Sequence, residues 1–383
     1  MRSFFPKTKG FPLLAVLLIG LAGCWSSGDS GRLSLSLTDV STDQYKAVYV
    51  TIAEIDVHAD ADVADTWTTV ATPNKTYNLL ELANGVREDL ALVDLVAGLY
   101  TQMRLIIGTH PDSGLNILNQ THPYANYVID LSDGTHELKV PSGLQTGIKL
   151  VQGFEINANS TTELTLDFDA SRSVVVAGNS GKYLLKPTVQ VIDTSLASII
   201  SGTVTQASDQ TPVAGALVTA QVYIDETAPA IDQVVVQAST LSDENGHYKL
   251  FVAANTQNQT YNLVASQEGF APLVFNLTAE GGQTYTQDFP LVAAPDTGTV
   301  DVDVAGAGQD IYATVSFRQQ VTLNSVAVMI EVASINVLDG GPYPVVLPVG
   351  DYSVVFSTPD RPSQEIPVTV AKDAHTAASV TFQ

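Results

Sequence analysis

The chain has 383 residues, of which 17 are basic, 40 are acidic and one is a cysteine, and its formal net charge is −23. A surface this acidic repels nucleic acid and anionic lipid headgroups, which excludes a nucleic-acid partner. A single cysteine excludes a disulfide framework and a thiolate metal site. The length and the apolar fraction of 45% provide material for two or three hydrophobic cores.

Residues 1–23 have the pattern of a signal peptide. Arg2, Lys7 and Lys9 form a positive segment, and the apolar run FPLLAVLLIGLAG leads directly into Cys24. The run is too short to span a bilayer comfortably. The letters LAGC at residues 21–24 resemble the lipobox of bacterial lipoproteins. An ordinary secretory signal, in which the sole cysteine falls there by coincidence, is the alternative.

The lipobox resemblance implies that Cys24 becomes the N-terminus and carries fatty acyl chains such as palmitate. Each buried acyl CH₂ contributes ~0.8 kcal/mol, so two or three chains hold a protein stably on a membrane. Trp25 follows Cys24, and a residue other than aspartate there resembles the sorting pattern for the outer membrane. We expect residues 24–31 to be a lipidated tether. Loss of residues 1–23 leaves 14 basic and 40 acidic side chains, a net charge of −26.

The rest of the chain reads as β-strands. Leu33, Leu35 and Leu37 alternate with polar residues, and later segments such as KAVYVTIAEIDVH, ELTLDFD and SVAVMIEVASINVL repeat this period of two. Residues 83–98 have the one pattern that also fits a helix, although their glycines and their β-rich neighbours count against it. The expected fold class is all-β, with tandem antiparallel β-sandwiches of transthyretin or immunoglobulin type.

Two segments resemble known families. Residues 32–193, which contain LSLTDV, AVYVTIAEIDVH, LVAGLYTQMRLIIG and LDFDASRSVVVAG in that order, resemble the bacterial lipoprotein domain of unknown function 4382. That resemblance implies an exported β-domain and no catalytic residue. Residues 198–293, with ISGTVTQASDQTPVAGALVTAQV and STLSDENGHYKLFV, are similar to a carboxypeptidase regulatory-like domain. It implies a transthyretin-like sandwich with a carbohydrate-binding-like fold and no peptidase activity.

Within residues 198–293, we expect Gly202 to open an edge strand, Ala216, Val218 and Ala220 to face inward, and Phe270 to fill the core. Residues 298–383 follow the linker AAPDTG and repeat the late-strand pattern of the preceding segment. We therefore expect a divergent third sandwich there.

The stretch EIDVHADADVADTW at residues 54–67 invites a metal interpretation. Counted from Asp56 or from Asp60, position six is not glycine and position twelve is not glutamate, so the calcium loop of EF-hands does not fit. His58 has no second histidine at a short spacing, so zinc does not fit either. We expect a solvated loop between two strands and no metal or cofactor. An irregular calcium site remains the alternative, with Asp60 and Asp62 as its first ligands.

No pattern for a catalytic nucleophile is present, so we expect no enzyme and no catalytic residue. Asp167, Asp169 and Arg172 in LDFDASR form the best local cluster, and an ion pair at the end of a strand explains it better than catalysis. Arg104 lies in an apolar strand, where it either reaches the surface or pairs with an acid.

The sequence therefore predicts a lipid-anchored, non-enzymatic binding or structural module of the bacterial cell envelope, in the outer membrane. Its expected partners are the membrane, through the N-terminal lipid, and a glycan or an envelope protein. Trp67 and exposed tyrosines offer stacking surfaces for sugar rings, although tyrosines in sandwiches usually belong to the core. The alternative is an envelope hydrolase of glycosidase type, or its accessory subunit, with an unrecognised pair of acids.

Overall fold

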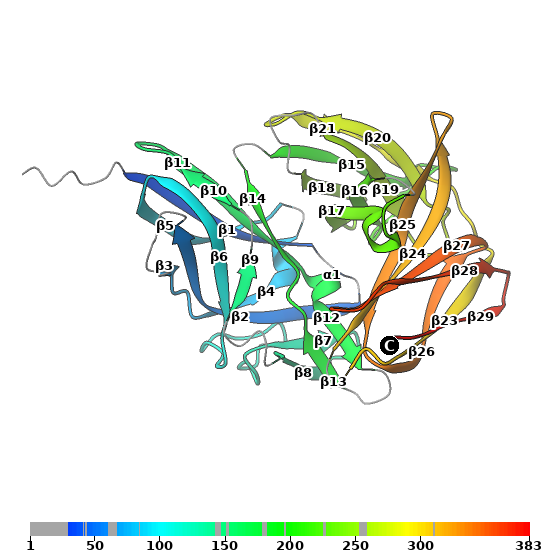
Figure 1. Ribbon diagram of the computed structural model, residues 1–383, viewed down its shortest axis with the longest axis horizontal. Helices are drawn as coiled ribbons and strands as arrows, with labels where there is room; N and C mark the ends of the chain where they lie inside the picture. Colours follow the sequence, from blue (N-terminus) through cyan, green and yellow to red (C-terminus); the bar gives the residue numbers. More distant parts are fainter. Residues whose placement is uncertain are drawn as a thin grey trace, which may run out of the picture.

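The structure is a computed structural model that describes residues 30–40, 42, 44–59, 67–83, 85–141, 147–150, 153–177, 182–194, 197–224, 227–252, 259–308 and 311–383. Almost all of its elements are strands, which confirms the expected all-β fold built of sandwiches. Figure 1 shows the strands of the first domain at one end of the molecule and the second and third domains at the other.

The first domain comprises residues 30–193. Its four-stranded sheet, in the order β14-β11-β1-β5, faces a second sheet that contains β10-β6-β2-β7-β8, with β3 and β4 also paired to β2 and β9 paired to β6. Its elements are β1 (Ser30–Val40), β2 (Tyr45–Ala59), β3 (Thr68–Ala71), β4 (Lys75–Asn78), η1 (Leu79–Leu82), β5 (Glu88–Val96), β6 (Gly98–Ile107), β7 (Tyr127–Asp130), β8 (Thr135–Lys139), β9 (Ile148–Leu150), β10 (Phe154–Ile156), β11 (Thr161–Asp169), α1 (Ala170–Ser173), β12 (Val174–Ala177), β13 (Lys182–Leu185) and β14 (Val189–Asp193).

Alternation along β1 builds the core of this domain. Leu33, Leu35 and Leu37 are fully buried, as the pattern predicted. The segment that also fitted a helix contains the strand β5, which pairs with β1 along its length. β1 begins at Ser30, two residues before the expected domain boundary, because Ser30 and Gly31 already pair with the end of β5.

The second and third domains have the same strand order. The sheets of the second domain are β18-β15-β21, with β22 also on β15, and β17-β16-β19-β20; those of the third are β26-β23-β29 and β25-β24-β27-β28. The elements are β15 (Ser198–Gln206), β16 (Leu217–Tyr223), η4 (Ala230–Asp232), β17 (Val234–Leu241), β18 (His247–Val252), β19 (Gln259–Ser266), β20 (Leu273–Ala279), β21 (Thr284–Thr286), β22 (Phe289–Leu291), β23 (Thr297–Ala305), β24 (Ala313–Leu323), β25 (Val326–Val337), β26 (Gly340–Pro348), β27 (Gly350–Ser357), β28 (Gln364–Val370) and β29 (His375–Thr381).

Two expectations about strand placement need correction. The sheets are mixed and not wholly antiparallel, because the first strand of each domain lies parallel to a late one: β1 to β11, β15 to β21 and β22, and β23 to β29. Gly202 lies inside β15, which is a central strand between β18 and β21 and not an edge strand. A side chain there would clash, since an added Cβ would lie 1.9 Å from the carbonyl oxygen of Gln287. Ala216, Val218 and Ala220 are fully buried, as expected.

The three domains share contacts across their boundaries. Val176 of β12 pairs with Val337 of β25, so one sheet continues from the first domain into the third. β25 also packs against β16, β17 and β19 of the second domain, and Val264 of β19 belongs to the hydrophobic core of the third. β25 is therefore the strand at which all three domains meet.

Candidate functional site

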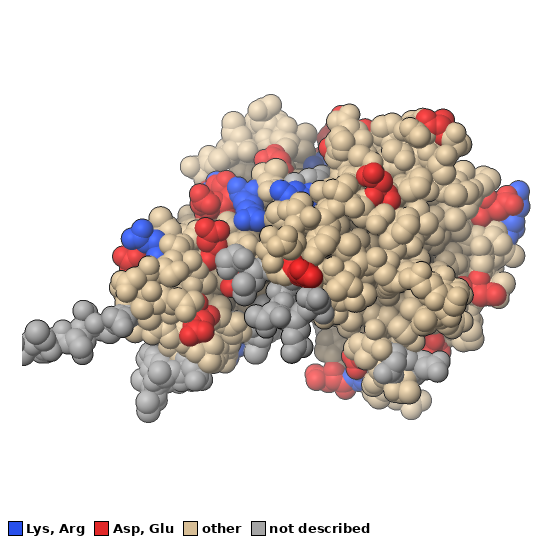
Figure 2. Space-filling view, turned by 90° about the horizontal axis from the view of Figure 1, so that it is seen from above, with Lys and Arg blue, Asp and Glu red and all other residues tan. Residues whose placement is uncertain are grey.

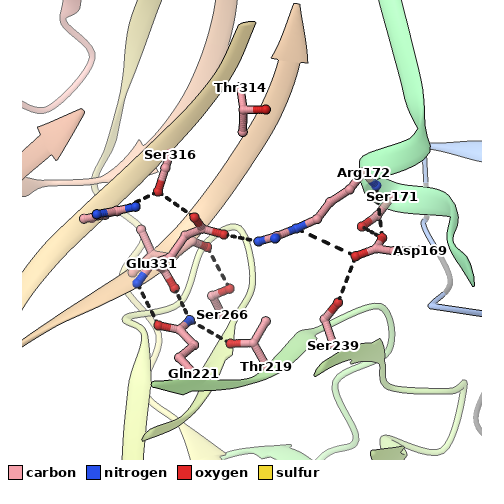
Figure 3. Close-up of polar contacts among 12 residues, drawn as sticks. Asp169, Ser171, Arg172, Thr219, Gln221, Ser239, Ser266, Thr314, Ser316 and Glu331 are labelled. Atoms are coloured by element: carbon pink, nitrogen blue, oxygen red, sulfur yellow. Dashed lines mark hydrogen bonds and ion pairs between the residues drawn. The ribbon is translucent and has the colours of Figure 1, made fainter. Parts of the chain in front are cut away.

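A buried polar network lies where the three domains meet, and Figure 3 shows most of it. At its centre Arg172 of α1 donates from Nη2 to Oε1 of Glu331 on β25 over 2.5 Å. The two side chains are 27% and 11% exposed, so water screens the pair only in part. We call this group the junction network; its members are Asp169, Arg172, Lys186, Gln221, Ser239, Thr314, Ser316, Arg318, Glu331 and Asn336.

The end of β11 positions Arg172. Asp169 caps the one-turn helix α1, since its Oδ1 accepts from the backbone N–H of Arg172 at 3.0 Å and from Ser171 Oγ at 2.5 Å. Its Oδ2 lies 3.7 Å from Arg172 Nε and accepts from Ser239 Oγ of the second domain at 3.4 Å. The ion-pair interpretation of the LDFDASR cluster is therefore confirmed for Asp169 and Arg172.

Glu331 forms hydrogen bonds with residues of all three domains. Its Oε2 accepts from Ser316 Oγ of β24 at 2.5 Å, while its Oε1 accepts from Arg172. Gln221 of β16, which is fully buried, donates to the main-chain carbonyl of Glu331 at 2.7 Å and accepts from its N–H at 2.9 Å. The Gln221 side chain thus continues the backbone pairing pattern of β25 across the domain boundary.

Arg318 brings a second buried guanidinium to the network. It is 2% exposed, donates from Nε to Ser316 Oγ at 2.9 Å, and donates from Nη1 and Nη2 to the carbonyls of Ala230 and Ile231 in η4. Burial lowers the pKa of Arg318. Burial also lowers the pKa of Arg172, but the carboxylates of Glu331 and Asp169 outweigh it, so the pKa of Arg172 is raised.

Lys186 connects the first and third domains beside this pair. Its Nζ donates to Thr314 Oγ1 at 3.0 Å and to Asn336 Oδ1 at 3.1 Å, and it lies 4.1 Å from the centre of the Tyr312 ring. Burial, and then the positive charge of Arg172, lower the pKa of Lys186 to about 7. The amine therefore titrates near neutral pH.

Asp167, the other acid of the predicted cluster, lies next to this network. Burial, and then the negative charge of Asp169, raise its pKa to about 7. A carboxyl group with such a pKa is able to exchange a proton near neutral pH. Asp167 is not among the residues that line the larger cleft described next.

A cleft of about 300 Å³ opens beside the junction network. Arg172 and Glu331 lie in its lining, and all three domains contribute walls. Its main apolar residues are Leu217, Leu241, Phe270, Pro272, Ile335, Val345, Val346 and Leu347, and its main polar ones are Gln44, Thr219, Ser239, Ser266, Gln267 and Glu268. Apolar walls with a few polar groups at this volume are typical of a small-ligand pocket.

Residues 60–66 of the predicted loop site, with Asp60 and Asp62, lie outside the described residues, as does Cys24. Nearby, Arg104 donates to Oδ2 of Asp56 at 3.0 and 2.6 Å, and Asp56 is 1% exposed. The Arg104 guanidinium also lies 4.5 Å above the Trp67 ring, against whose edge His58 packs at 5.5 Å. Arg104 therefore pairs with an acid, and one face of Trp67 is covered by a cation.

Half of the 14 tyrosines are buried core residues. The buried ones are Tyr49, Tyr77, Tyr100, Tyr127, Tyr248, Tyr261 and Tyr352. Tyr124 is 41% exposed. Phe270, expected in the core, is half-buried and lines the cleft, so it is an aromatic ring that a ligand is able to reach.

Sequence reasoning missed Lys186, Gln221, Arg318 and Glu331. Glu331 and Arg318 each interrupt an apolar alternation, in VAVMIEVASINV and ATVSFRQQVTL. A lone charge at an inward position of a strand signals a buried partner. The partners come from other domains, however, and the sequence contains no sign of that pairing.

Within the described residues, no three histidine, cysteine or acidic side chains gather as a metal site would require. Over the same residues, no helix is long and apolar enough to span a membrane.

Comparison with protein families confirms both resemblances seen in the sequence. Residues 30–187 match the model of the domain of unknown function DUF4382, and residues 199–292 match that of the carboxypeptidase regulatory-like domain. A search of curated proteins finds no match.

Solved structures similar to the chain include the Bacillus anthracis TIE protein and two pilins. The Bacillus anthracis TIE protein is 12% identical with a TM-score of 0.20, over 93% of this chain and 51% of its own, so the chain spans about half of its length. A streptococcal ancillary pilin is 12% identical with a TM-score of 0.20, over 92% of this chain and 99% of its own. The shaft pilin SpaA of Lactobacillus rhamnosus GG is 10% identical with a TM-score of 0.20, over 50% of this chain and 98% of its own. Such low scores support no conclusion about this chain.

Proposed function

We propose that the chain is a lipid-anchored, non-enzymatic binding module of the bacterial outer membrane, and that the cleft at the domain junction binds an uncharged saccharide. The observation that carries the proposal is the cleft itself, which all three domains line and whose lining includes Arg172 and Glu331 of the junction network. A site held in place by surrounding hydrogen bonds loses little conformational entropy when a ligand binds.

The lining of the cleft favours a neutral, hydroxyl-rich ligand. Arg172 and Glu331 neutralise each other, which leaves the carboxylate of Glu268 as the remaining charge in the lining and no net positive charge to attract an anion. The hydroxyl of Ser266 and the amide of Gln267 supply donors and acceptors, and the Phe270 ring supplies a flat apolar surface. Sugar rings present this same combination of hydroxyl edges and apolar C–H faces.

A glycan array probed with the full-length chain, followed by calorimetry on any hit, tests the ligand. We expect saturable binding that Phe270→Ala weakens at least tenfold, about 1.4 kcal/mol. Tyr124→Ala, which removes an exposed aromatic ring outside the cleft lining, is the matched control and retains the affinity. Circular dichroism of both variants separates loss of the site from loss of the fold. A complete lack of saturable binding would refute the saccharide proposal.

An envelope hydrolase is the second candidate, and the pKa of Asp167 of about 7 is the observation that favours it. The same array distinguishes the two functions if released sugars are measured by mass spectrometry. Bound ligand that is recovered intact supports a binding module. Product release that Asp167→Asn abolishes would instead establish the hydrolase.

The lipid anchor rests on the lipobox-like residues 21–24 and on the sole cysteine. Mass spectrometry of the mature N-terminus is expected to find Cys24 acylated, and Cys24→Ala is expected to move the protein out of the membrane fraction. An unmodified Cys24 in the mature protein would refute the anchor.

A further inference from the structure

One end of the first domain surrounds the start of β1. Ser30, the first residue of β1, pairs with Val96 at the end of β5, and its carbonyl accepts from the N–H of Asn159 at 2.9 Å. The N–H of Arg32 donates to the carbonyl of Ser160 at 2.8 Å. The turn between β5 and β6 and the turn between β10 and β11 therefore flank the point where the chain enters the domain. We call Ser30, residues 95–100 and residues 156–162 the N-terminal tip.

The N-terminal tip is uncharged and partly aliphatic. Residues 95–100 read LVAGLY and residues 156–162 read INANSTT, with no charged side chain in either, in a chain of net charge −23. Val96 and Leu99 are 64% and 49% exposed, and Leu92, on the same strand as Val96, is 64% exposed. Elsewhere acidic side chains are scattered over the surface, as the face in Figure 2 shows.

The backbone of the N-terminal tip is firmly held. Tyr100 stacks on Phe154 with ring centres 5.3 Å apart, and its hydroxyl donates to the Val96 carbonyl at 3.1 Å. Gly98 pairs with Ile156, which is 1% exposed. Val96 and Leu99 therefore project from a fixed turn.

We propose that the N-terminal tip is a membrane-contact surface, and that Val96 and Leu99 enter the interfacial region of the bilayer to which Cys24 is anchored. This inference rests on the proposed lipid anchor. Ser30 is the sixth residue after Cys24, and an extended chain of six residues spans at most about 20 Å, so the tip stays close to the bilayer.

Electrostatics and burial select this end for the contact. The acidic faces of the domain are repelled by anionic headgroups, whereas the tip itself carries no charge. Glu155, which pairs with Leu99 in the ladder, and the Arg32–Asp94 ion pair beside Val96 border the tip. Exposed valine and leucine side chains gain free energy when they leave water for the acyl boundary. Contact at this end directs the second and third domains away from the membrane, because they lie at the other end of the molecule (Figure 1).

Site-specific fluorescence on the lipidated full-length chain tests the contact. If Cys24 is acylated, Leu99→Cys carries the only free thiol, and an environment-sensitive dye attached there reports its surroundings in phosphatidylcholine–phosphatidylglycerol vesicles. Val326→Cys is the matched control, because Val326 is a 60% exposed aliphatic residue at the turn between β24 and β25. We expect a lipid-borne quencher to quench the dye at position 99 several-fold more than the dye at position 326, and an aqueous quencher to show the reverse.

Flotation of the same vesicles separates the two proposals. Protein that floats while both dyes respond equally to the aqueous quencher would overturn the membrane contact and leave the anchor intact. Protein that fails to float would overturn both. A second arm uses a variant that combines Val96→Asp, Leu99→Asp and Ala97→Cys, with the dye attached at position 97. We expect this protein to float normally while the lipid-borne quencher no longer quenches the dye. Unchanged quenching would contradict the proposed roles of Val96 and Leu99.

Discussion

Replacing Glu331 by glutamine tests whether the junction network holds the domains together. The variant keeps the size of the side chain and the main-chain bonds to Gln221, but it removes the negative charge that faces Arg172. Arg172, Lys186 and Arg318 then remain close together, with Asp169 as the nearest carboxylate of the junction network. Loss of one partner from a buried pair costs 3–5 kcal/mol; because Arg172 is 27% exposed, we expect about 2–3 kcal/mol.

Urea unfolding of the full-length chain, followed by circular dichroism and tryptophan fluorescence, measures the loss. With a urea slope of about 2 kcal/mol/M, this loss of stability corresponds to an unfolding midpoint that is lower by about 1–1.5 M. Asp94→Asn is the control, since it breaks an ion pair with Arg32 in which both side chains are more than half exposed, at 66% and 51%. That variant is expected to leave the midpoint unchanged.

The outcome that refutes this reasoning is a Glu331→Gln midpoint equal to that of the parent chain. A double variant, Arg172→Met with Glu331→Leu, sharpens the test. It removes both charges and leaves two apolar side chains, so we expect it to recover part of the stability that the single change loses. A double variant less stable than Glu331→Gln would contradict the electrostatic account and favour a steric one.

Three further outcomes are expected. The pKa of Lys186, about 7, lies below its ordinary 10.5, so between these values the unfolded chain binds more protons than the folded one, and stability rises from pH 7 to 10. The pKa of Asp167 is raised from 3.8 to about 7, so between these values the folded chain binds more protons, and stability falls from pH 4 to 7. The melting temperature plotted against pH should therefore show a dip near pH 7 whose alkaline side disappears in Lys186→Met; an unchanged profile would contradict the assignment. Arg104→Gln leaves the buried carboxylate of Asp56 without its cation, so we expect the free energy of unfolding in urea to fall by about 3 kcal/mol and the tryptophan emission to change. An unaltered urea midpoint would show that the pair is solvated. Gly202→Ala places a methyl group 1.9 Å from a main-chain carbonyl oxygen and should lower the melting temperature or the soluble yield, whereas a parent-like protein would show that β15 shifts freely.

Local patterns predicted the fold class because burial alternates along each strand. The period of two identified the inward leucines of β1, and it also identified Ala216, Val218 and Ala220 in β16. Strand neighbours are set by contacts far apart in the chain, which explains why Gly202 was placed on an edge strand when β15 is central. The helical alternative for residues 83–98 failed for the same reason, since β5 is extended through its pairing with β1.

The candidate site was predictable only in its local part. Asp169 and Arg172 lie three residues apart, so the sequence alone indicated their ion pair. Glu331 lies 159 residues beyond Arg172, and Gln221 contacts Glu331 from 110 residues away. The periodicity of a sequence carries no information about contacts between residues so far apart in the chain. The cleft and the network beside it could therefore be identified only from the structure.

The parallel register of β1 and β11 bears on how the molecule responds to mechanical load. Residues 32–40 of β1 pair in order with residues 161–169 of β11, and β5 flanks β1 on the other side. A force applied at Ser30 and resisted by the far domains pulls β1 along its own axis, across the slanted hydrogen bonds to β11 and the perpendicular ones to β5. Those bonds are then sheared together and not opened one at a time, so the strand that enters the domain is arranged to resist tension.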